Sequence, residues 1–126
     1  MKVILDTNFL VYCAGRKIDF MQELERLFLK PEIILPNQVL LELRKIAEKG
    51  SGKDSKAASL ALEILALPQN KERVNLVSSP ESNADKAILN LAVRNSVIAS
   101  FDKELKKSSP PSRFLRIKNK ALSILD

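Results

Sequence analysis

The chain has 126 residues, a length that suits one domain with a single hydrophobic core. Hydrophobic residues make up 45% and charged residues 29%, which is ordinary for a globular protein, and no apolar run is long enough for a membrane span. The apolar start of the chain is too short for a secretory signal, so we expect a cytoplasmic protein with no membrane partner.

The net charge and the absence of some residue types limit the kinds of catalytic site that the chain can contain. The net charge of +6 comes from 21 basic and 15 acidic residues, and it favours contact with nucleic acid, although a lysine-rich soluble protein would show the same balance. Histidine is absent, which excludes His-based triads and His-ligated zinc. Cys13 is the single cysteine and lies in an apolar stretch, which predicts a buried, inert thiol. Catalysis would therefore depend on carboxylates, lysines, hydroxyls or a bound ion.

In chain order, the first half of the sequence predicts two strands and four helices. Short apolar runs predict strands at 2–5 and 32–35. Capping residues and helical spacing predict helices at 7–14, at 19–29, from Pro36 to 48, and from 54 or 55 to the residue before Pro68.

The second half predicts three further strands, at 73–77, 97–100 and 114–117. Ser82 is expected to cap a helix that continues to residue 95, and 102–107 is expected to be a short helix. The segment 108–112, with two prolines, predicts a loop, and the last residues predict one helical turn.

Short, wholly apolar strands that alternate with helices are typical of a parallel sheet covered on both faces. We therefore expect residues 1–126 to form a single α/β/α sandwich with a four- or five-stranded parallel sheet. No internal repeat or linker divides the chain.

Four acidic residues are candidates for a shared site. Asp6 and Asp102 come just after predicted strands, where parallel α/β sheets place their active sites. Asp85 lies on the side of its helix that Ile88 occupies, so its carboxylate is expected to point toward the core. Glu42 lies at the border of an apolar helix face. Taken singly, each has an ordinary structural explanation: helix capping for the three aspartates, and a paired or solvated surface position for Glu42.

Taken together, the four acids predict a divalent-metal site. Carboxylates gathered at one sheet edge would repel one another and resist ionisation, and Mg²⁺ or Mn²⁺ relieves this because both prefer oxygen ligands. A carboxylate-bound metal polarises a phosphate and lowers the pKa of a water without help from histidine. Basic residues elsewhere would then hold the phosphate backbone of a nucleic acid.

In these segments the chain resembles the PIN-domain ribonucleases. The resemblance rests on segments that occur in order over nearly the whole chain: LDTN at 5–8, LEL at 41–43, ADKAI at 84–88 and SFDKEL at 100–105. Within that superfamily the chain is similar to the archaeal branch that resembles the eukaryotic ribosomal-RNA processing PIN nucleases. This resemblance implies a Mg²⁺- or Mn²⁺-dependent endoribonuclease and a homodimer, with four catalytic metal ligands: Asp6, Glu42, Asp85 and Asp102.

Other residues have supporting roles by chemistry and by the same resemblance. Asn8 and Ser100 would orient the ligating carboxylates or metal-bound water, and Glu104 is a candidate fifth acid, although a solvated helix position explains it equally. A basic group in the C-terminal third is predicted to contact RNA phosphates, with a solvated charged surface as the alternative: Lys103, Lys106, Lys107, Arg113 and Arg116, with Lys118 and Lys120. Aromatic residues make up 5%, so no base-stacking platform is expected.

Two positions depart from the family pattern. Lys86 stands where many relatives have a second acid, and Phe101 stands where an asparagine usually precedes the last aspartate. Two alternatives therefore accompany the ribonuclease hypothesis: the toxin of a toxin–antitoxin pair, and a non-catalytic PIN-like RNA-binding or assembly module. Besides RNA and a second copy of the chain, the partners implied are ribosome-assembly factors or an antitoxin.

Overall fold

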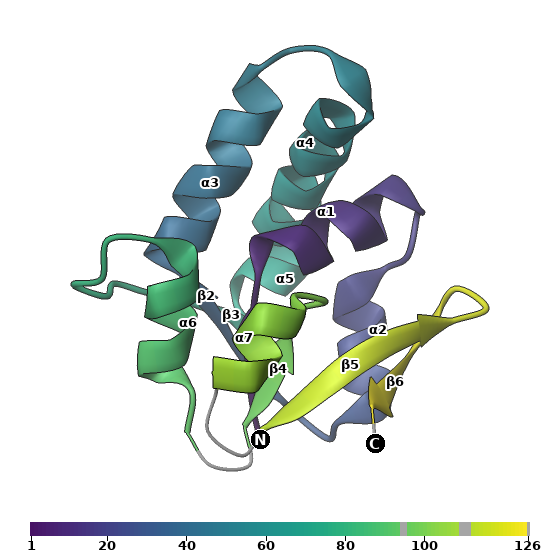
Figure 1. The fold of residues 1–126 in the computed structure, drawn as a ribbon. Helices are drawn as coiled ribbons and strands as arrows, with labels where there is room; N and C mark the ends of the chain where they lie inside the picture. Colours follow the sequence, from purple (N-terminus) through teal and green to yellow (C-terminus); the bar gives the residue numbers. More distant parts are fainter. Residues whose placement is uncertain (94–95, 109–111, 126) are drawn as a thin grey trace.

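The computed structural model describes residues 1–93, 96–108 and 112–125. They form a sheet in the order β3-β2-β1-β4-β5-β6, flanked by helices (Figure 1). The strands are β1 (Lys2–Leu5), β2 (Glu32–Pro36), β3 (Val74–Val77), β4 (Val97–Ala99), β5 (Arg113–Lys118) and β6 (Ala121–Leu125). The strands from β3 to β5 are parallel, and β6 is antiparallel to β5. The predicted α/β fold is confirmed, with six strands in the described residues rather than four or five.

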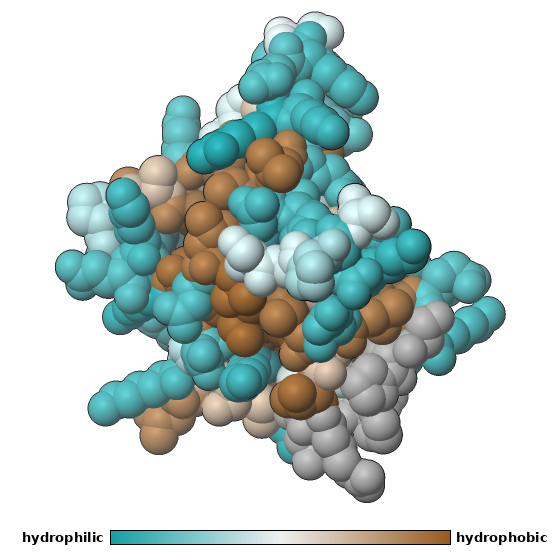
Figure 2. All heavy atoms as spheres, turned by 90° about the vertical axis from the view of Figure 1, so that its left-hand side faces the viewer, coloured by the Kyte–Doolittle hydropathy of each residue, from teal (hydrophilic) through white to brown (hydrophobic). Residues whose placement is uncertain are grey.

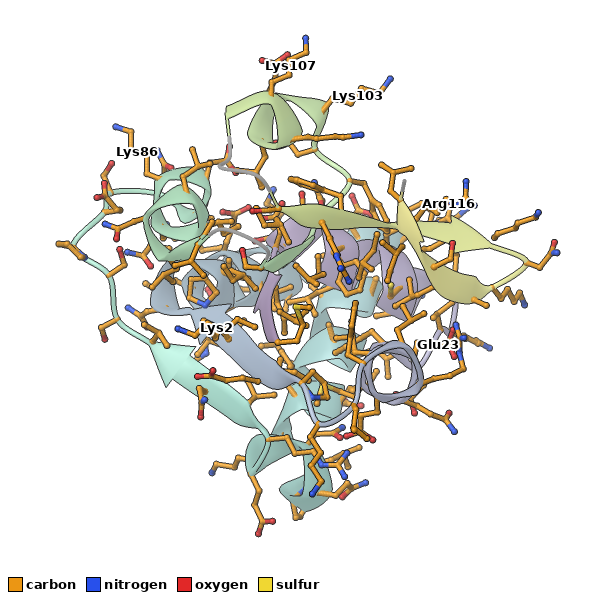
Figure 3. All side chains as sticks on the ribbon, turned by 90° about the horizontal axis from the view of Figure 1, so that it is seen from below. Lys2, Glu23, Lys86, Lys103, Lys107 and Arg116 are labelled. Carbon is orange, nitrogen blue, oxygen red and sulfur yellow. The ribbon has the colours of Figure 1, made fainter. Side chains whose placement is uncertain are left out.

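Helices cover both faces of the sheet. They are α1 (Thr7–Gly15), α2 (Phe20–Leu27), α3 (Asn37–Glu48), α4 (Gly52–Ala66), α5 (Pro68–Lys71), α6 (Ala84–Leu91) and α7 (Lys103–Ser108). In the view from below, α6 and α7 lie on one side of the sheet, and α2 and α5 lie on the other (Figure 3). Helices α3 and α4 lie side by side and project beyond the carboxyl ends of the strands (Figure 1). None of the helices in the described ranges has the length and apolar character needed to cross a membrane.

The centre of the sheet is formed by β1 and β4, whose apolar residues are buried without alternation. Val3, Ile4 and Leu5 have no exposed surface, as expected for a strand covered on both faces. Leu5 pairs with Ala99 of β4, and the Asp6 N–H donates to the Ala99 carbonyl at 3.0 Å. This register places the first residues beyond the two strands next to each other at the carboxyl edge.

The helix predicted to continue to residue 95 is shorter than expected. It ends at Leu91, because Ala92 adopts an extended backbone with φ −67° and ψ 129°. Asn83, and not Ser82, provides its cap, since the Asn83 side chain accepts from the Lys86 N–H at 2.9 Å. Residues 94 and 95, like 109–111 of the predicted loop, lie outside the described residues.

Helix α4 also begins earlier than predicted, at Gly52 rather than at residue 54 or 55, with Ser51 before it. Pro68, expected only to follow the end of this helix, starts the short helix α5, where its missing N–H costs nothing. Pro36 is the last residue of β2, and α3 begins at Asn37, one position later than predicted.

The prediction of a helical turn at the C-terminus is wrong. Asn119 and Lys120 both have positive φ, 53° and 61°, and they connect β5 to β6 as a two-residue turn. Turns of this kind match the twist of a hairpin but usually contain glycine, and Lys120 gives no such signal in the sequence. The last residues therefore return along β5 as an antiparallel edge strand.

Helix α2 holds this hairpin in place through one charged pair (Figure 3). The Glu23 carboxylate accepts from the Leu122 N–H at 2.8 Å, and the Arg26 guanidinium donates to the Leu122 carbonyl at 2.6 Å. The two side chains also bond each other at 3.0 Å. The Arg26 and Leu122 hydrogen bonds lower the pKa of Glu23. The charged form of Glu23 is therefore the form that the fold stabilises.

Cys13 lies in α1 with none of its surface exposed. Burial raises the pKa of its thiol to about 12, so almost no thiolate exists at neutral pH. The thiol is buried as predicted.

We expect Glu23→Gln to destabilise the protein by about 1 kcal/mol at neutral pH, because charge-assisted hydrogen bonds to Leu122 and Arg26 are weakened. Since the folded-state pKa of Glu23 is lowered, its contribution is present above the ordinary glutamate pKa and is lost as the pH falls through the folded value. Urea unfolding at neutral and acidic pH measures this, with Glu48→Gln on exposed α3 surface as the control. Equal effects of the two variants at neutral pH would contradict it.

Candidate active site

The site is built on two residues at the ends of the central strands. Asp6 and Ser100 directly follow β1 and β4, and both are buried, with 4% and 1% of their surfaces exposed. The Ser100 hydroxyl donates to Oδ2 of Asp6 at 2.6 Å, and the Thr7 N–H donates to Oδ1 at 2.7 Å. Asp6 therefore caps α1, which is the structural role that the sequence offered for it. Asp6 is also buried at the carboxyl edge of the sheet, where parallel α/β proteins have their active sites.

Burial sets the protonation of Asp6. Loss of solvent raises its pKa from 3.8 to about 6, against the hydrogen bonds from Ser100 and Thr7, which lower it. The negative charges of Asp85 and Glu42 raise it further. Two of the other predicted acids are therefore close enough to Asp6 to influence its charge.

The fourth acid, Asp102, is attached to the same centre through Ser100. The Ser100 hydroxyl oxygen accepts from the Asp102 N–H at 3.1 Å, while Asn8 Oδ1 accepts from the Phe101 N–H at 3.2 Å. The Asp102 carboxylate itself accepts from the N–H groups of Glu104 and Leu105 at 2.9 and 3.3 Å, so it caps α7. Asn8 and Ser100, predicted to support the acids, thus hold the segment between β4 and α7 against β1.

Asp85 and Glu42 lie at the rim and not in the core. Asp85 is exposed in the first turn of α6, whose buried residues are its neighbours Ala84, Ala87 and Ile88, so the inference that it faces the core is wrong. Partial burial raises the pKa of Asp85, and the charge of Asp102 raises it further. Glu42 is exposed on α3 and lines a groove that also contains Thr7 and Asn8. The two acids therefore lie on separate helices, at the rim of the site around Asp6 and Ser100.

The donor set suits a hard divalent cation, because carboxylate, hydroxyl and amide oxygens meet here and Asp6 would gain most from a positive neighbour. Within residues 1–93, 96–108 and 112–125, no three acidic side chains converge closely enough to enclose an ion as arranged. Repulsion between like charges favours such separation, and the exposed Glu42 and Asp85 side chains have room to turn. The residues fit Mg²⁺ or Mn²⁺ in chemistry, and closure around the ion would require these two side chains to move.

Two further polar side chains contribute that the sequence did not single out. Thr7 Oγ1 is buried beside Asp6 and makes no hydrogen bond to any described residue. Gln38 Nε2 donates to the carbonyls of Ser79 and Glu81 at 2.8 and 2.7 Å, which holds the segment leading to α6 and Asp85. These partners lie 41 and 43 residues from Gln38, so no local spacing could indicate them.

The predicted RNA contacts separate into two groups. Lys103, Lys106 and Arg116 line a groove of about 420 Å³ that includes Ser100 and Asp102. Lys107 forms an exposed ion pair with Glu104 at 3.8 Å, and Arg113 is exposed at the start of β5, as are Lys118 at its end and Lys120 in the turn. Glu104 is therefore a solvated helix residue in this arrangement. Figure 3 shows Lys103 and Lys107 extending outward from α7.

The structure places both residues that depart from the family pattern. Lys86 is exposed and points away from the body of the protein (Figure 3). The Phe101 ring packs against Phe9 and Tyr12, with ring centroids 5.6 and 5.2 Å apart. Phe101 thus anchors the segment before α7 by aromatic packing, at the position where the resemblance predicts an asparagine.

We expect Asp6→Asn to stabilise the metal-free protein at pH 7.5 by roughly 2 to 3 kcal/mol, because ionising the buried Asp6 opposes folding. The pKa of Asp6 is raised from 3.8 to about 6, so this cost is absent below pH 4, grows between the two values and is complete above the upper one. Asparagine keeps an acceptor for the Thr7 N–H. Thermal and urea unfolding across this pH range with chelator present measure the difference.

The control is Asp19→Asn, which changes an exposed N-cap whose carboxylate accepts from the Gln22 N–H at 3.1 Å. It should show no comparable gain, because Asp19 is not buried. A loss of stability in Asp6→Asn at every pH would instead assign Asp6 a purely capping role.

Comparison with known proteins identifies the family of the chain. Residues 3–111 match the family described as "PIN like domain". Ribonuclease VapC4 of the archaeon Methanocaldococcus jannaschii is 37% identical over 111 residues, which cover 84% of this chain and 80% of that protein. A solved structure of the PIN domain endonuclease Utp24 superposes with a TM-score of 0.74 at 24% identity, over 98% of this chain and 90% of the other, which supports the fold alone. The chain belongs to the PIN-like domain family.

Proposed function

We propose that this protein is a divalent-metal-dependent endoribonuclease that hydrolyses RNA phosphodiesters. The observation that carries the proposal is the state of Asp6: a buried carboxylate at the carboxyl edge of a parallel sheet, with a pKa of about 6 and the charges of Asp85 and Glu42 close enough to raise it. A structural cap needs none of these features. A cation bound beside these carboxylates would remove the repulsion and stabilise the ionised form of Asp6.

In the proposed mechanism Asp6, Glu42, Asp85 and Asp102 would hold Mg²⁺ or Mn²⁺. When bound, the ion would supply positive charge that lowers the pKa of a water and offsets the charge of the scissile phosphate. Ser100 fixes the Asp6 carboxylate through its 2.6 Å hydrogen bond, and Asn8 keeps the α7 segment in register through the Phe101 N–H. Gln38 holds the segment before α6, which keeps Asp85 at the rim. Each of these polar contacts positions a carboxylate and leaves the acids themselves to bind the ion.

RNA as substrate is supported by the net charge of +6, by the basic residues near Asp102, and by the name of the 37% identical relative, Ribonuclease VapC4. The resemblance to the ribosomal-RNA processing branch favours a role in ribosomal RNA maturation, with ribosome-assembly factors as partners. The second candidate, which the resemblance to the PIN-domain ribonucleases leaves open, is a toxin ribonuclease held by an antitoxin. A small reading frame adjacent to the gene would favour the toxin role.

A homodimer is part of the proposal, and an exposed apolar surface supports it. Leu41 on α3, Leu76 on β3 and Val93 after α6 are 46%, 56% and 48% exposed. Figure 2 shows apolar side chains gathered across the side of the molecule on which α3 and α6 lie. Exposed apolar patches mark interaction surfaces in soluble proteins.

We expect purified protein to cut RNA with Mn²⁺ or Mg²⁺ and to stop when chelator is added. Asp6→Asn should reduce turnover by about 100-fold or more, because a ligand that supplies several kcal/mol of charge stabilisation is lost. RNA binding by the variant should persist or strengthen, since one negative charge near the phosphate is removed. Gel assays on structured and single-stranded RNAs measure cleavage.

Glu63→Gln, which removes an equal charge from the exposed surface of α4, is the control and should cut as the wild type does. Cleavage that survives excess chelator, or an Asp6→Asn variant as active as wild type, would contradict the proposal. Absence of cleavage across many RNAs, together with no calorimetric binding of Mn²⁺, would favour a non-catalytic RNA-binding or assembly module.

A further inference from the structure

A second and larger groove begins at the acid cluster and leads away from α7. It encloses about 950 Å³ between α1, the C-terminal half of α3 and the first turn of α4. Thr7, Asn8 and Glu42 line its inner end, next to Asp6. This volume lies near the upper limit of the roughly 300–1,000 Å³ typical of small-ligand sites, which leaves room for more than one nucleotide unit.

The outer end of the groove is basic and rich in backbone donors. Three basic residues line the groove: Arg16 directly after α1, Lys49 directly after α3, and Lys53 in the first turn of α4. The turn between α3 and α4 contains Gly50 and Gly52, with φ of +74° and +86°, a conformation that favours glycine. Ser51 makes no side-chain hydrogen bond to the first turn of the 15-residue α4. The helix therefore presents N–H groups that the Ser51 side chain does not cap, together with the positive end of its dipole. Asp54, in the first turn of α4, also lines the groove and offsets part of this positive charge.

An independent feature of the groove also indicates a polar ligand. Thr7 lines the inner end, is 5% exposed, and has a hydroxyl without a hydrogen-bond partner in the described part of the chain. Buried hydroxyl groups are normally satisfied, so this one is available to a polar group from outside the described residues. A polar group bound at the end of the groove nearest Asp6 would supply that partner.

Tyr12 stands on the rim where the two grooves meet. It lines both of them, and 38% of its surface is exposed. The Arg16 guanidinium lies 3.5 Å from the centre of its ring, and the Phe101 ring packs edge-on at 5.2 Å. Such a held aromatic–guanidinium pair is the arrangement on which an unstacked base packs. The low aromatic content of the chain does not exclude it, because one placed ring is sufficient.

We propose that this groove, rather than the basic C-terminal third, holds single-stranded RNA next to the scissile phosphate. A phosphate of the flanking strand binds at the 50–53 turn, with Lys53, Lys49 and Arg16, and a base stacks at Tyr12. The inference rests on the proposed ribonuclease function and adds the strand's path. Single-stranded RNA is the class that fits, because a paired base has no free face for Tyr12.

The test is binding without turnover. Asp6→Asn protein is titrated in chelator with a fluorescein-labelled, short single-stranded RNA, and anisotropy is measured over a range of salt. Adding Lys53→Gln or Arg16→Gln should raise Kd by about three- to ten-fold and lower the salt slope by about one, as expected for a lost phosphate contact. Lys56→Gln and Lys17→Gln are matched controls, because both lysines are exposed neighbours outside the groove lining.

The stacking contact has its own pair of variants. Tyr12→Leu should raise Kd by about five-fold or more, whereas Tyr12→Phe keeps the ring and should bind almost as tightly as the parent. Unfolding curves show whether each variant is folded, and the surface changes at Lys53 and Arg16 do not depend on core packing.

The outcomes separate the inference from the function on which it rests. If wild type cuts RNA with Mn²⁺ but Lys53→Gln, Arg16→Gln and Tyr12→Leu bind RNA as the parent does, the inference is wrong and the ribonuclease function stands. If Lys103→Gln with Lys107→Gln weakens binding and the groove variants do not, the strand follows α7 instead, which also overturns it. If wild type cuts no RNA while the groove variants lose binding, the path stands and the nuclease proposal fails.

Discussion

The hydrogen bond from Ser100 to Asp6 connects the ends of the two strands at the centre of the sheet. Both partners are buried, and their 2.6 Å contact follows from the register that pairs Leu5 with Ala99. A slip of β1 by one residue would reverse which faces its side chains occupy and would remove the contact. The site therefore depends on the same parallel pairing that builds the core, and only its outer acids depend on helices.

A carboxylate in this position opposes folding on its own. Desolvation and neighbouring negative charge both disfavour the ionised form of Asp6, so the metal-free protein carries an electrostatic cost at neutral pH. The fold tolerates this because the surrounding structure is secured elsewhere: by a continuous apolar core, by the Gln38 contacts to the segment before α6, and by the α2 pair that binds the terminal hairpin. A bound cation would remove this repulsion between carboxylates. The free energy released in this way would add to the affinity for the cation and would stabilise the folded protein.

The sequence predicted the central part of the fold well, because Val3, Ile4 and Leu5 have no alternation and can only be a strand covered on both faces. Asp6, Ser100, Asn8 and Asp102 were predictable for the same reason, since each lies near a strand end. The hairpin was not, because Asn119 and Lys120 adopt positive φ without glycine, under the constraint of contacts to α2. Placement of Asp85 failed because helical spacing assumed that α6 packs on the side of Ile88 and Leu89, whereas tertiary packing buried Ala84 and Ala87 with Ile88.

Contacts between distant segments account for the rest of what the sequence left unseen. Gln38 acts on carbonyls about forty residues away, and the groove beside Thr7 exists only when α1, α3 and α4 are brought together. The sequence pointed to the basic C-terminal third as the RNA contact because its basic residues are close together in the chain. Arg16, Lys49 and Lys53 are far apart in the sequence, so no sequence pattern groups them. The fold brings these residues together from distant parts of the chain. Residue patterns along the sequence therefore cannot predict such a cluster.

The burial of Cys13 gives the protein a practical property. Its thiol has no exposed surface and a pKa of about 12, so thiol reagents at neutral pH find almost no thiolate and no access. Toward maleimides and nitroxide labels the native chain behaves as if it had no cysteine at all. A single cysteine introduced on the surface would therefore carry a dye or spin label alone, and distances or crosslinks from any chosen point on the molecule can be measured without first replacing a core residue.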